Sequence, residues 1–222
     1  MASLGKIYSY PNNYRVQRAQ ALAALNGTTI ELDSAFQMGV TNRTPEFLAK
    51  FPLGKVPAFE SADGTLHLTE GQAIARYAAE SGPKAAQLLG EDVKTRALVE
   101  QWSCFAEQEL SSNMLPPMLM CVFKMYPYDE ARFGQCVAGF ERAAKRVEAA
   151  LEGGKKFLVG EQLTLADVMV VGVLQVAAKF VMDQEMLKGL PNVEAYLKGM
   201  LEVPELKEAF GALEVCAEKV KP

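Results

Sequence analysis

The pattern of secondary-structure signals changes once along this chain of 222 residues, at Gly82-Pro83, and that change constrains the fold. Before this point, short β-prone runs alternate with helical segments, whereas the segments after it have helical spacing only. A strand crossover followed by a hairpin builds a small mixed sheet that helices cover. We therefore predict an α/β domain over residues 1–82, a linker over 83–90 and an all-helical domain over 91–222.

The N-terminal part predicts the element order β-α-β-α-β-β-α. Asp63-Gly64 lies between two β-prone runs and is the strongest hairpin signal in the chain. Thr44-Pro45-Glu46 has the composition of a helix start, with threonine as N-cap and proline at the first helical position. The predicted strands cover residues 7–10, 28–32, 56–60 and 65–69, and the predicted helices cover 14–26, 44–51 and 70–81.

The C-terminal part predicts helices over residues 92–110, 131–151, 164–180, 193–201 and 204–213. Pro116-Pro117 should break or bend the chain after the first of them, because proline lacks the helical N–H. Thr164-Leu165-Ala166-Asp167 resembles a capping box with aspartate in the place of glutamate. The helix that it opens should be central, because its residues between Asp167 and Lys179 are apolar, glycine or glutamine.

The composition argues against several classes of function. A formal net charge of −4 does not suit a nucleic-acid binder, which would carry a basic stripe. A membrane-spanning helix needs roughly 20 apolar residues, and no uncharged run is that long. Lys6, Arg15 and Arg18 interrupt the stretch where a secretory signal would have its apolar core, so we expect a cytoplasmic protein.

The cysteine and histidine residues narrow the chemistry further. The four cysteines are far apart and match no zinc spacing, so we expect free thiols and no metal at Cys104, Cys121, Cys136 and Cys216. Because no cysteine precedes Cys104, the N-terminal domain cannot perform thiol–disulfide chemistry with its own residues. The one histidine, His67, is interpreted as an outward-facing residue of a hairpin strand.

The segment Lys55-Val56-Pro57 is a candidate binding site. A proline that opens a strand cannot donate to the sheet, and a cis bond there would turn the Val56 backbone toward solvent. The N–H and C=O groups of Val56 could then pair with an extended peptide, as an added strand would. A trans proline on an edge strand explains the same residues without any binding role.

A second candidate, Thr69-Glu70-Gly71-Gln72-Ala73-Ile74, lies where a predicted strand meets a predicted helix. Free N–H groups at such a helix start favour an anion, and the Glu70 carboxylate could hold an ammonium group. Together these groups suit the zwitterionic end of an amino acid. A plain helix cap is the alternative interpretation.

These motifs resemble a known family. Residues 51–57, Phe-Pro-Leu-Gly-Lys-Val-Pro, followed by residues 70–74, Glu-Gly-Gln-Ala-Ile, resemble the glutathione site of glutathione transferases. Thr164 to Asp167 resembles the capping signature of the helical domain in that family. The match is closer to the transferase-like N-terminal domain of translation elongation factor 1 gamma, through residues 41–59, 7–11 and 157–161. The resemblance implies a thioredoxin-like domain followed by an all-helical domain.

The resemblance also implies roles for particular residues. It implies that Val56, beside Lys55, binds the cysteinyl backbone of glutathione, that Pro57 is cis, and that Glu70 and Gly71 hold the γ-glutamyl end. The sequence departs from the family at Gly71, where most transferases have serine or threonine. A lost neutral hydrogen bond costs about 0.5–1.5 kcal/mol, so glutathione binding should weaken several-fold to about tenfold.

The residue that activates the glutathione thiol is expected at the start of the first helix. Family members use tyrosine, serine, cysteine or asparagine in this region, and the chain offers Asn12, Asn13 and Tyr14, with Tyr8 behind them. We favour Asn12, because Pro-Asn before a helix resembles the asparagine-using transferases. Equally, Asn12 and Asn13 suit a turn and a helix cap without any catalytic role.

A second substrate is expected between the domains, in an apolar pocket formed by Tyr14, Met114, Met118, Cys121 and Phe123. The same methionines also suit a helical core. The resemblance further implies a homodimer that pairs through the hairpin edge and the helix around Trp102.

Three functions follow from this sequence. The first is a glutathione transferase that conjugates the glutathione thiol to small electrophiles. The second is an assembly module that holds subunits of the translation elongation factor, either as a free-standing relative or as an excised domain. The third is a glutathione-binding protein without turnover. Fold alone does not separate them, because function depends on the site.

Overall fold

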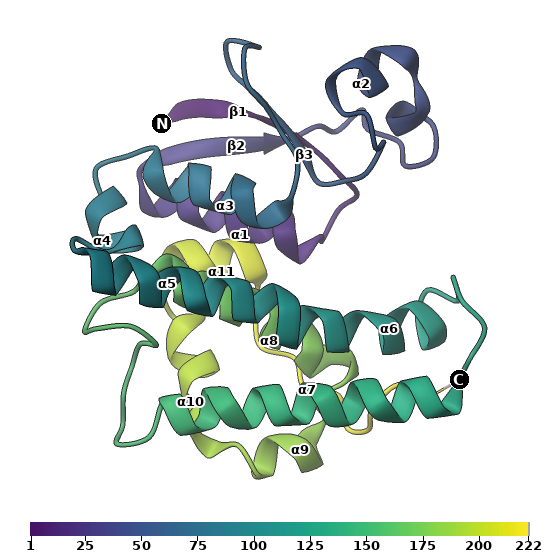
Figure 1. Ribbon diagram of the computed structural model, residues 1–222, viewed down its shortest axis with the longest axis vertical. Helices are drawn as coiled ribbons and strands as arrows, with labels where there is room; N and C mark the ends of the chain where they lie inside the picture. Colours follow the sequence, from purple (N-terminus) through teal and green to yellow (C-terminus); the bar gives the residue numbers. More distant parts are fainter. Residues whose placement is uncertain (222) are drawn as a thin grey trace. The chain divides into compact units, whose positions relative to one another are not determined.

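The computed structural model describes residues 1–221, and the chain divides into two compact units. The first unit spans Met1–Glu91, and the second begins at Asp92 (Figure 1). Within the segment expected to be a linker, residues 85–89 form a short helix, α4 (Ala85–Leu89).

The first unit has the predicted element order β-α-β-α-β-β-α, with a short 3₁₀ turn and α4 in addition. Its elements are β1 (Ala2–Tyr8), α1 (Tyr14–Leu25), β2 (Thr28–Leu32), η1 (Thr41–Arg43), α2 (Pro45–Lys50), β3 (Ala58–Ser61), β4 (His67–Leu68) and α3 (Gly71–Glu80). The strands form one mixed sheet in the order β2-β1-β3-β4, in which β1 is parallel to β2 and antiparallel to β3. Helices α1 and α3 pack together against this sheet (Figure 1). The expected thioredoxin-like topology is confirmed.

The limits of three strands in the first unit differ from the expectation. The first strand spans Ala2–Tyr8 and not residues 7–10. The third strand begins at Ala58 and not at Val56, because the two preceding residues make no strand pairing. The fourth strand is only His67–Leu68, because its first expected residue, Thr65, belongs to the hairpin turn and bonds the Asp63 carboxylate through its N–H and hydroxyl.

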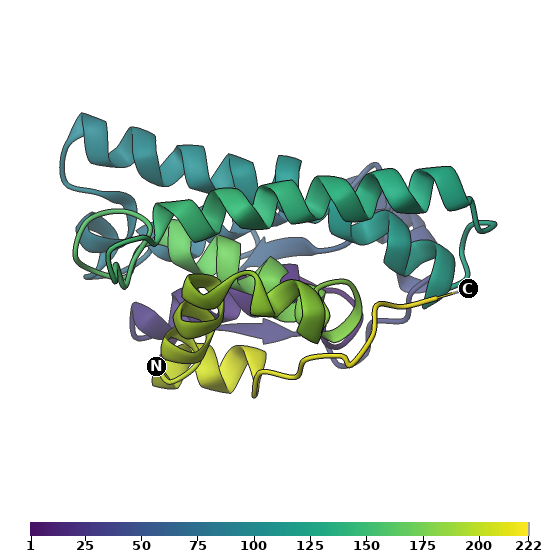
Figure 2. The ribbon, with the colours of Figure 1, turned by 90° about the horizontal axis from the view of Figure 1, so that it is seen from below.

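The second unit is helical throughout its described residues. Its helices are α5 (Val93–Phe105), η2 (Ala106–Ser111), α6 (Ser112–Cys121), α7 (Glu130–Ala150), α8 (Leu165–Phe180), α9 (Gln184–Lys188), α10 (Pro191–Met200) and α11 (Pro204–Phe210). Figure 2 shows α7 as the longest of them and an extended segment after α11 (yellow). That segment is hydrogen-bonded to the end of α8, where the N–H of Cys216 donates to the Ala178 carbonyl at 2.8 Å. The expectation of an all-helical half with α8 at its centre is confirmed, since thirteen of the sixteen residues of α8 are buried.

Of the break or bend expected at Pro116-Pro117, the break was wrong, because both prolines lie inside α6, which continues to Cys121. A bend there stays a prediction. Each proline leaves a carbonyl one turn earlier without its helical donor. The chain adjusts just before this point, where residues 106–111 form a π-helix (η2). Side chains also bond the backbone there, since the Ser112 hydroxyl donates to the Gln108 carbonyl and the Asn113 amide donates to the Glu109 carbonyl.

Within residues 1–221, no helix is long and apolar enough to cross a membrane, and no three acidic, cysteine or histidine side chains form a metal-binding group. All four cysteines are free thiols, as expected.

The start of α8 is held by the buried carboxylate of Asp167. This carboxylate accepts from the Thr164 backbone N–H at 2.8 Å, the Thr164 hydroxyl at 3.0 Å and the Leu158 N–H at 2.9 Å. The Tyr196 hydroxyl of α10 donates to it at 2.9 Å. Burial raises the pKa of Asp167, and these four donors act against that shift. One side chain therefore joins the α7–α8 connection, the α8 cap and α10.

We expect the substitution Asp167→Ala to lower the free energy of unfolding by about 3–4 kcal/mol, because it leaves several buried donors without an acceptor. Tyr196→Phe, which removes only one donor, should cost about 1.5–3 kcal/mol. Urea unfolding monitored by circular dichroism measures both. Equal losses for the two variants would contradict a network centred on Asp167.

Candidate functional site

The strand pairing brings three separate segments to one end of the sheet. Tyr8, the last residue of β1, pairs with Ala58, the first residue of β3, and Leu68 at the end of β4 pairs with Phe59. The chain that leaves β1, the chain that enters β3 and the chain that leaves β4 therefore meet at this end. They carry residues 12–14, 55–57 and 70–71, which are the sites expected from the sequence.

Val56 presents an unpaired backbone at this end of the sheet. Within residues 1–221, neither its N–H nor its C=O takes part in a hydrogen bond. Its side chain packs against the cluster formed by Phe47, Phe51 and Ala58, which fixes the position of the backbone. The peptide bond between Val56 and Pro57 is cis, as expected. Lys55 is exposed and forms no ion pair within the described residues.

Asn42, which the sequence analysis did not single out, holds the loop that leads to Val56. Its buried side chain donates to the Gly54 carbonyl at 2.7 Å and accepts from the Gly39 N–H at 2.6 Å. Gly54 has a φ of +59°, and a side chain there would meet the Asn42 carbonyl at 2.8 Å. The sequence signal for this anchor is weak, because asparagine is common in loops of every kind.

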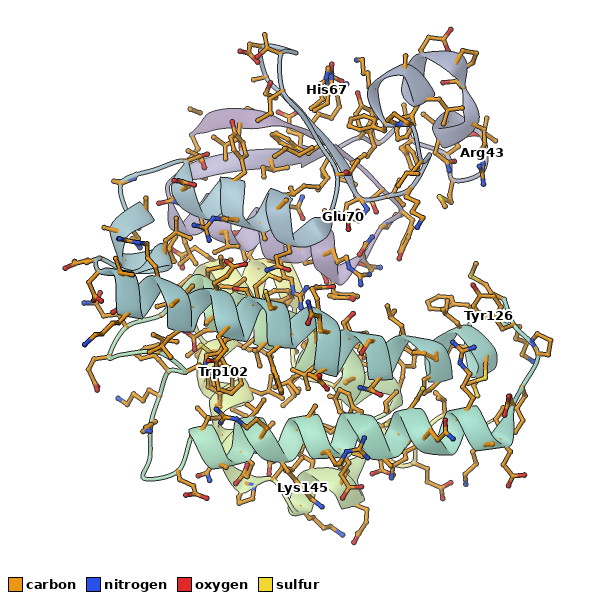
Figure 3. All side chains as sticks on the ribbon, in the orientation of Figure 1. Arg43, His67, Glu70, Trp102, Tyr126 and Lys145 are labelled. Atoms are coloured by element: carbon orange, nitrogen blue, oxygen red, sulfur yellow. The ribbon has the colours of Figure 1, made fainter. Side chains whose placement is uncertain are left out.

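Glu70 has a backbone conformation that side-chain-bearing residues rarely adopt. Its φ is +63° and its ψ is +112°, which lies outside the left-handed region that asparagine and aspartate visit. Such a residue costs on the order of 1–3 kcal/mol, and residues of this kind cluster at functional sites. Its carboxylate is exposed and has no partner among the described residues, at the N-terminal end of α3 (Figure 3).

Gly71, the first residue of α3, leaves space that Arg15 fills. A Cβ atom at position 71 would meet the Cδ, Cβ and Cγ atoms of Arg15 at 2.9, 3.0 and 3.1 Å. The Arg15 side chain therefore passes directly over the start of α3. The sequence suggested only the loss of a hydroxyl donor at Gly71, but the structure shows in addition that Arg15 crowds the place that any side chain at position 71 would take.

The two asparagines at the start of α1 have different environments. Asn13 is the N-cap, since its side chain accepts from the Arg15 N–H at 3.1 Å and donates to the Ser9 hydroxyl at 2.9 Å. The structure thus confirms the capping interpretation for Asn13, whose side-chain oxygen and nitrogen each have a partner within the protein. Asn12 is exposed, has a φ of +60°, and forms no hydrogen bond within residues 1–221.

Tyr8 and Tyr14 are both engaged within the protein. The Tyr8 hydroxyl donates to the Glu60 carboxylate at 2.7 Å, and burial together with that carboxylate raises the pKa of Tyr8 well above its usual value. Tyr14 begins α1, and the guanidinium groups of Arg15 and Arg18 lie 4.7 and 4.8 Å from its ring centroid.

The residues expected for the second-substrate pocket belong to different units. Met114, Met118 and Cys121 are buried residues of α6, spaced so that they share a helix face, and burial raises the pKa of the Cys121 thiol. Phe123 follows α6 and is exposed. That Tyr14 joins them in one pocket stays a prediction.

We expect Glu70→Gly to be more stable than Glu70→Ala by about 1 kcal/mol, because only glycine adopts a positive φ without strain. Both variants remove the carboxylate, so their difference isolates the backbone. Urea unfolding is the measurement, and equal stabilities would show that Glu70 is not held in this conformation.

We expect Gly71→Ser to lower the free energy of unfolding by about 1–3 kcal/mol through overpacking against Arg15. In the Arg15→Ala background the cost should be smaller, because two of the three crowding atoms are then absent. A double-mutant cycle measures this coupling. Additive costs would mean that Arg15 does not occupy the space beside Gly71.

Comparison with known proteins matches both halves of the chain. The model for the glutathione S-transferase N-terminal domain matches residues 3–80, and the model for the C-terminal domain matches residues 110–204. A glutathione S-transferase-like protein from a Fusarium species is 43% identical over 95% of this chain and 94% of its own length. A glutathione S-transferase-like protein of Aspergillus aculeatus is 42% identical over 90% of this chain and 93% of its length.

The expected similarity to elongation factor 1 gamma is confirmed. The factor of Rattus norvegicus is 35% identical over 96% of this chain but only 47% of its own length, so this chain spans about half of that relative. The transferase-like domain of elongation factor 1 gamma from Saccharomyces cerevisiae superposes with a TM-score of 0.81 at 20% identity, over 99% of this chain and 98% of that domain.

A glutathione S-transferase bound to lactoylglutathione gives a TM-score of 0.80 at 24% identity, over 95% of this chain and 100% of its own. At these identities, the structural likeness shows the fold alone. The relatives that align with nearly the whole chain decide the classification, and they show that this chain belongs to the glutathione S-transferase family.

Proposed function

We propose that this chain binds glutathione and conjugates its thiol to small electrophilic substrates. The observation that carries the proposal is the meeting of three segments at one sheet end, each with a group that suits a different part of the tripeptide. The unpaired Val56 backbone suits the main chain of the central cysteine, as an added strand would. The Glu70 carboxylate suits the γ-glutamyl ammonium group.

The start of α3 supports binding of the γ-glutamyl carboxylate. Helix N-termini attract anions through their free N–H groups and the helix dipole. The methylene groups of Arg15 cross this helix start, and its guanidinium, 4.7 Å from the Tyr14 ring centroid, adds a positive charge to the same region. We therefore expect glutathione to bind even though the hydroxyl donor at position 71 is absent. Lys55, exposed beside Val56, suits the glycyl carboxylate.

Asn12 is the proposed activator of the thiol. A free thiol has a pKa near 8.5, so at neutral pH only a few per cent is ionised. A hydrogen bond to a charged group contributes about 1.5–3 kcal/mol, which corresponds to a pKa lowered by about one to two units. The amide of Asn12 has no internal partner, whereas Asn13 and Tyr8 are engaged within the protein.

In the proposed reaction, the thiol loses its proton to water and the thiolate sulfur attacks the electrophilic carbon. A C–S bond forms, and the leaving group departs with the bonding electrons. Holding the thiolate in place raises its effective concentration toward the second substrate. We propose that Tyr14, Met114, Met118 and Cys121 receive that substrate, because methionine adapts to varied apolar shapes. The chain is further proposed to act as a cytoplasmic homodimer.

The decisive variant is Asn12→Gly. Because Asn12 has a positive φ, glycine preserves the turn, so a turn residue tolerates this change while a catalytic residue does not. We expect kcat/KM for conjugation of glutathione to 1-chloro-2,4-dinitrobenzene to fall about 10- to 100-fold, which is the loss of one charged hydrogen bond. The apparent pKa of the pH profile should rise by about one to two units.

Two controls make this test specific. Glutathione affinity, measured by calorimetry, should change little in Asn12→Gly and should fall in Glu70→Gln. Unchanged turnover in Asn12→Gly would eliminate Asn12 as activator, whereas glutathione binding by the wild-type chain without any turnover would eliminate conjugation itself.

A second candidate function is an assembly module of a translation elongation factor. The similarity to elongation factor 1 gamma, at 35% identity over 96% of this chain, favours it. If this function is the main one, the purified chain should bind subunits of that factor stoichiometrically in gel filtration. Asn12→Gly and Glu70→Gln should leave that binding unchanged.

A further inference from the structure

The loop between α6 and α7, residues 122–129, carries a group of exposed apolar side chains. They are Phe123, Met125, Tyr126 and Tyr128, and between 42% and 67% of each residue is exposed. Figure 3 shows Tyr126 on this loop, just beyond the end of α6. Exposed apolar patches of this kind mark interaction sites on soluble proteins.

Hydrogen bonds hold both ends of this loop. The N–H of Met125 donates to the Leu119 carbonyl at 2.8 Å, which joins the loop to the last turn of α6. At the other end, the Asp129 carboxylate caps α7 by accepting from the Arg132 N–H at 3.0 Å. The exposed side chains therefore belong to a backbone that is anchored at both ends.

A cavity of about 500 Å³ lies between this loop and α6, and we call it the tyrosine groove. The loop contributes Tyr126, Pro127 and Tyr128 to its lining, and α6 contributes Pro116 and Leu119. Tyr126 and Tyr128 are two positions apart in a segment without helical structure, and both line the groove. Their hydroxyl groups form no hydrogen bond within residues 1–221. The groove therefore offers two aromatic rings and two available hydroxyl donors.

The tyrosine groove differs from the pocket proposed for the second substrate. That pocket uses Met114, Met118 and Cys121 of α6, and none of these three residues lines the groove. A ligand of the groove therefore need not compete with the proposed conjugation reaction.

Asp129 adds an available negative charge to the tyrosine groove. Its Oδ1 atom serves the α7 cap, and its Oδ2 atom has no hydrogen-bond partner within residues 1–221. Arg132 also lines the groove but forms no ion pair with Asp129 in the described part of the chain. The Arg132 guanidinium instead acts on the Cys136 thiol, one turn further along α7, where it opposes the rise in pKa that burial causes.

A polyproline II segment is the form of peptide that suits this combination of groups. Its backbone has no internal hydrogen bonds, so its carbonyl groups are free to accept from hydroxyl donors. Three residues per turn place both prolines of a Pro-x-x-Pro sequence on one face, where they pack against aromatic rings. Such a segment is already extended in solution, so it loses little entropy when it binds.

We propose that the tyrosine groove binds a proline-rich segment of another protein, with a lysine or arginine of that segment at Asp129. The rings of Tyr126 and Tyr128 contact the prolines, and their hydroxyls donate to carbonyl groups of the segment. The Oδ2 atom of Asp129 pairs with the basic residue and so sets the direction of the segment. A small apolar ligand would leave all three of these polar groups unused.

Fluorescence anisotropy with a labelled peptide, a lysine followed by three Pro-Pro-Ala repeats, tests this proposal. We expect saturable binding of one peptide per chain, and at least tenfold weaker binding when alanine replaces every proline. Replacement of the lysine by glutamate should weaken binding about threefold to tenfold. No saturable binding up to about 1 mM peptide, or equal affinity for the alanine peptide, would overturn the proposal.

Matched variants locate the site. Tyr126→Ala should reduce peptide affinity about tenfold, while Phe123→Ala should not. Phe123 is the appropriate control, because it is exposed to a similar extent in the same loop but does not line the groove. Asp129→Asn keeps a good helix cap and should weaken binding about threefold, whereas Glu130→Gln, which removes the same charge from the next position, should bind as the wild type does. Wild-type affinity in Tyr126→Ala would contradict the proposal.

NMR of isotope-labelled tyrosine rings gives a readout that does not depend on variants. The peptide should shift the ring resonances of Tyr126 and Tyr128 and leave those of Tyr10, which is exposed to a similar extent in the first unit. Shifts at Tyr10 alone would place the peptide elsewhere and contradict the proposal.

Two further outcomes would assign the groove to a different occupant. Competition between the peptide and 1-chloro-2,4-dinitrobenzene would mean that the groove belongs to the second-substrate site. A change of oligomeric state in Tyr126→Ala, measured by gel filtration, together with no peptide binding by the wild type, would mean that a second copy of this chain covers the groove. Either result would overturn the proposal.

Discussion

The register of the β1–β3–β4 pairing is the constraint on which the candidate site depends. Tyr8 opposite Ala58 and Phe59 opposite Leu68 bring the segments after β1, before β3 and after β4 to one sheet end. A shift of one residue in either pairing would turn these side chains to the opposite face of the sheet. The buried cluster of Phe47, Phe51 and Ala58 opposes such a shift, because it requires the present face to be inward.

Unfavourable local features gather at this end of the sheet. Glu70 and Asn12 both have positive φ angles, and the backbone of Val56 is unpaired. Each feature would be costly if it served only the fold, since unstrained and paired alternatives exist. Within the same unit, the buried Asn42 side chain supports the loop before Val56 through its hydrogen bonds to Gly39 and Gly54. This division is expected when a stable framework holds a binding site.

Most of the fold could be predicted from the sequence, because the signals are local. The Asp63-Gly64 turn, the Thr44 cap and the Thr164–Asp167 motif each determine the backbone conformation of a few neighbouring residues. The break predicted at Pro116-Pro117 was wrong, because α6 begins directly after the π-helix η2 and continues through both prolines to Cys121. The general rule that proline breaks a helix does not take the neighbouring helical structure into account.

The sequence by itself determined the order of elements in the first unit, the two halves and the motifs at Val56 and Glu70, since hydrophobic period and turn chemistry act over short distances. It missed α6 and α9 in the second unit. Only the tertiary structure decided which asparagine is the cap, because that depends on whether Ser9 and the Arg15 N–H lie within reach. It also decided that Arg15 lies over Gly71 and that Pro116 and Tyr126 border one cavity. Such facts depend on the space between side chains from separate segments, which folding sets and local sequence does not encode.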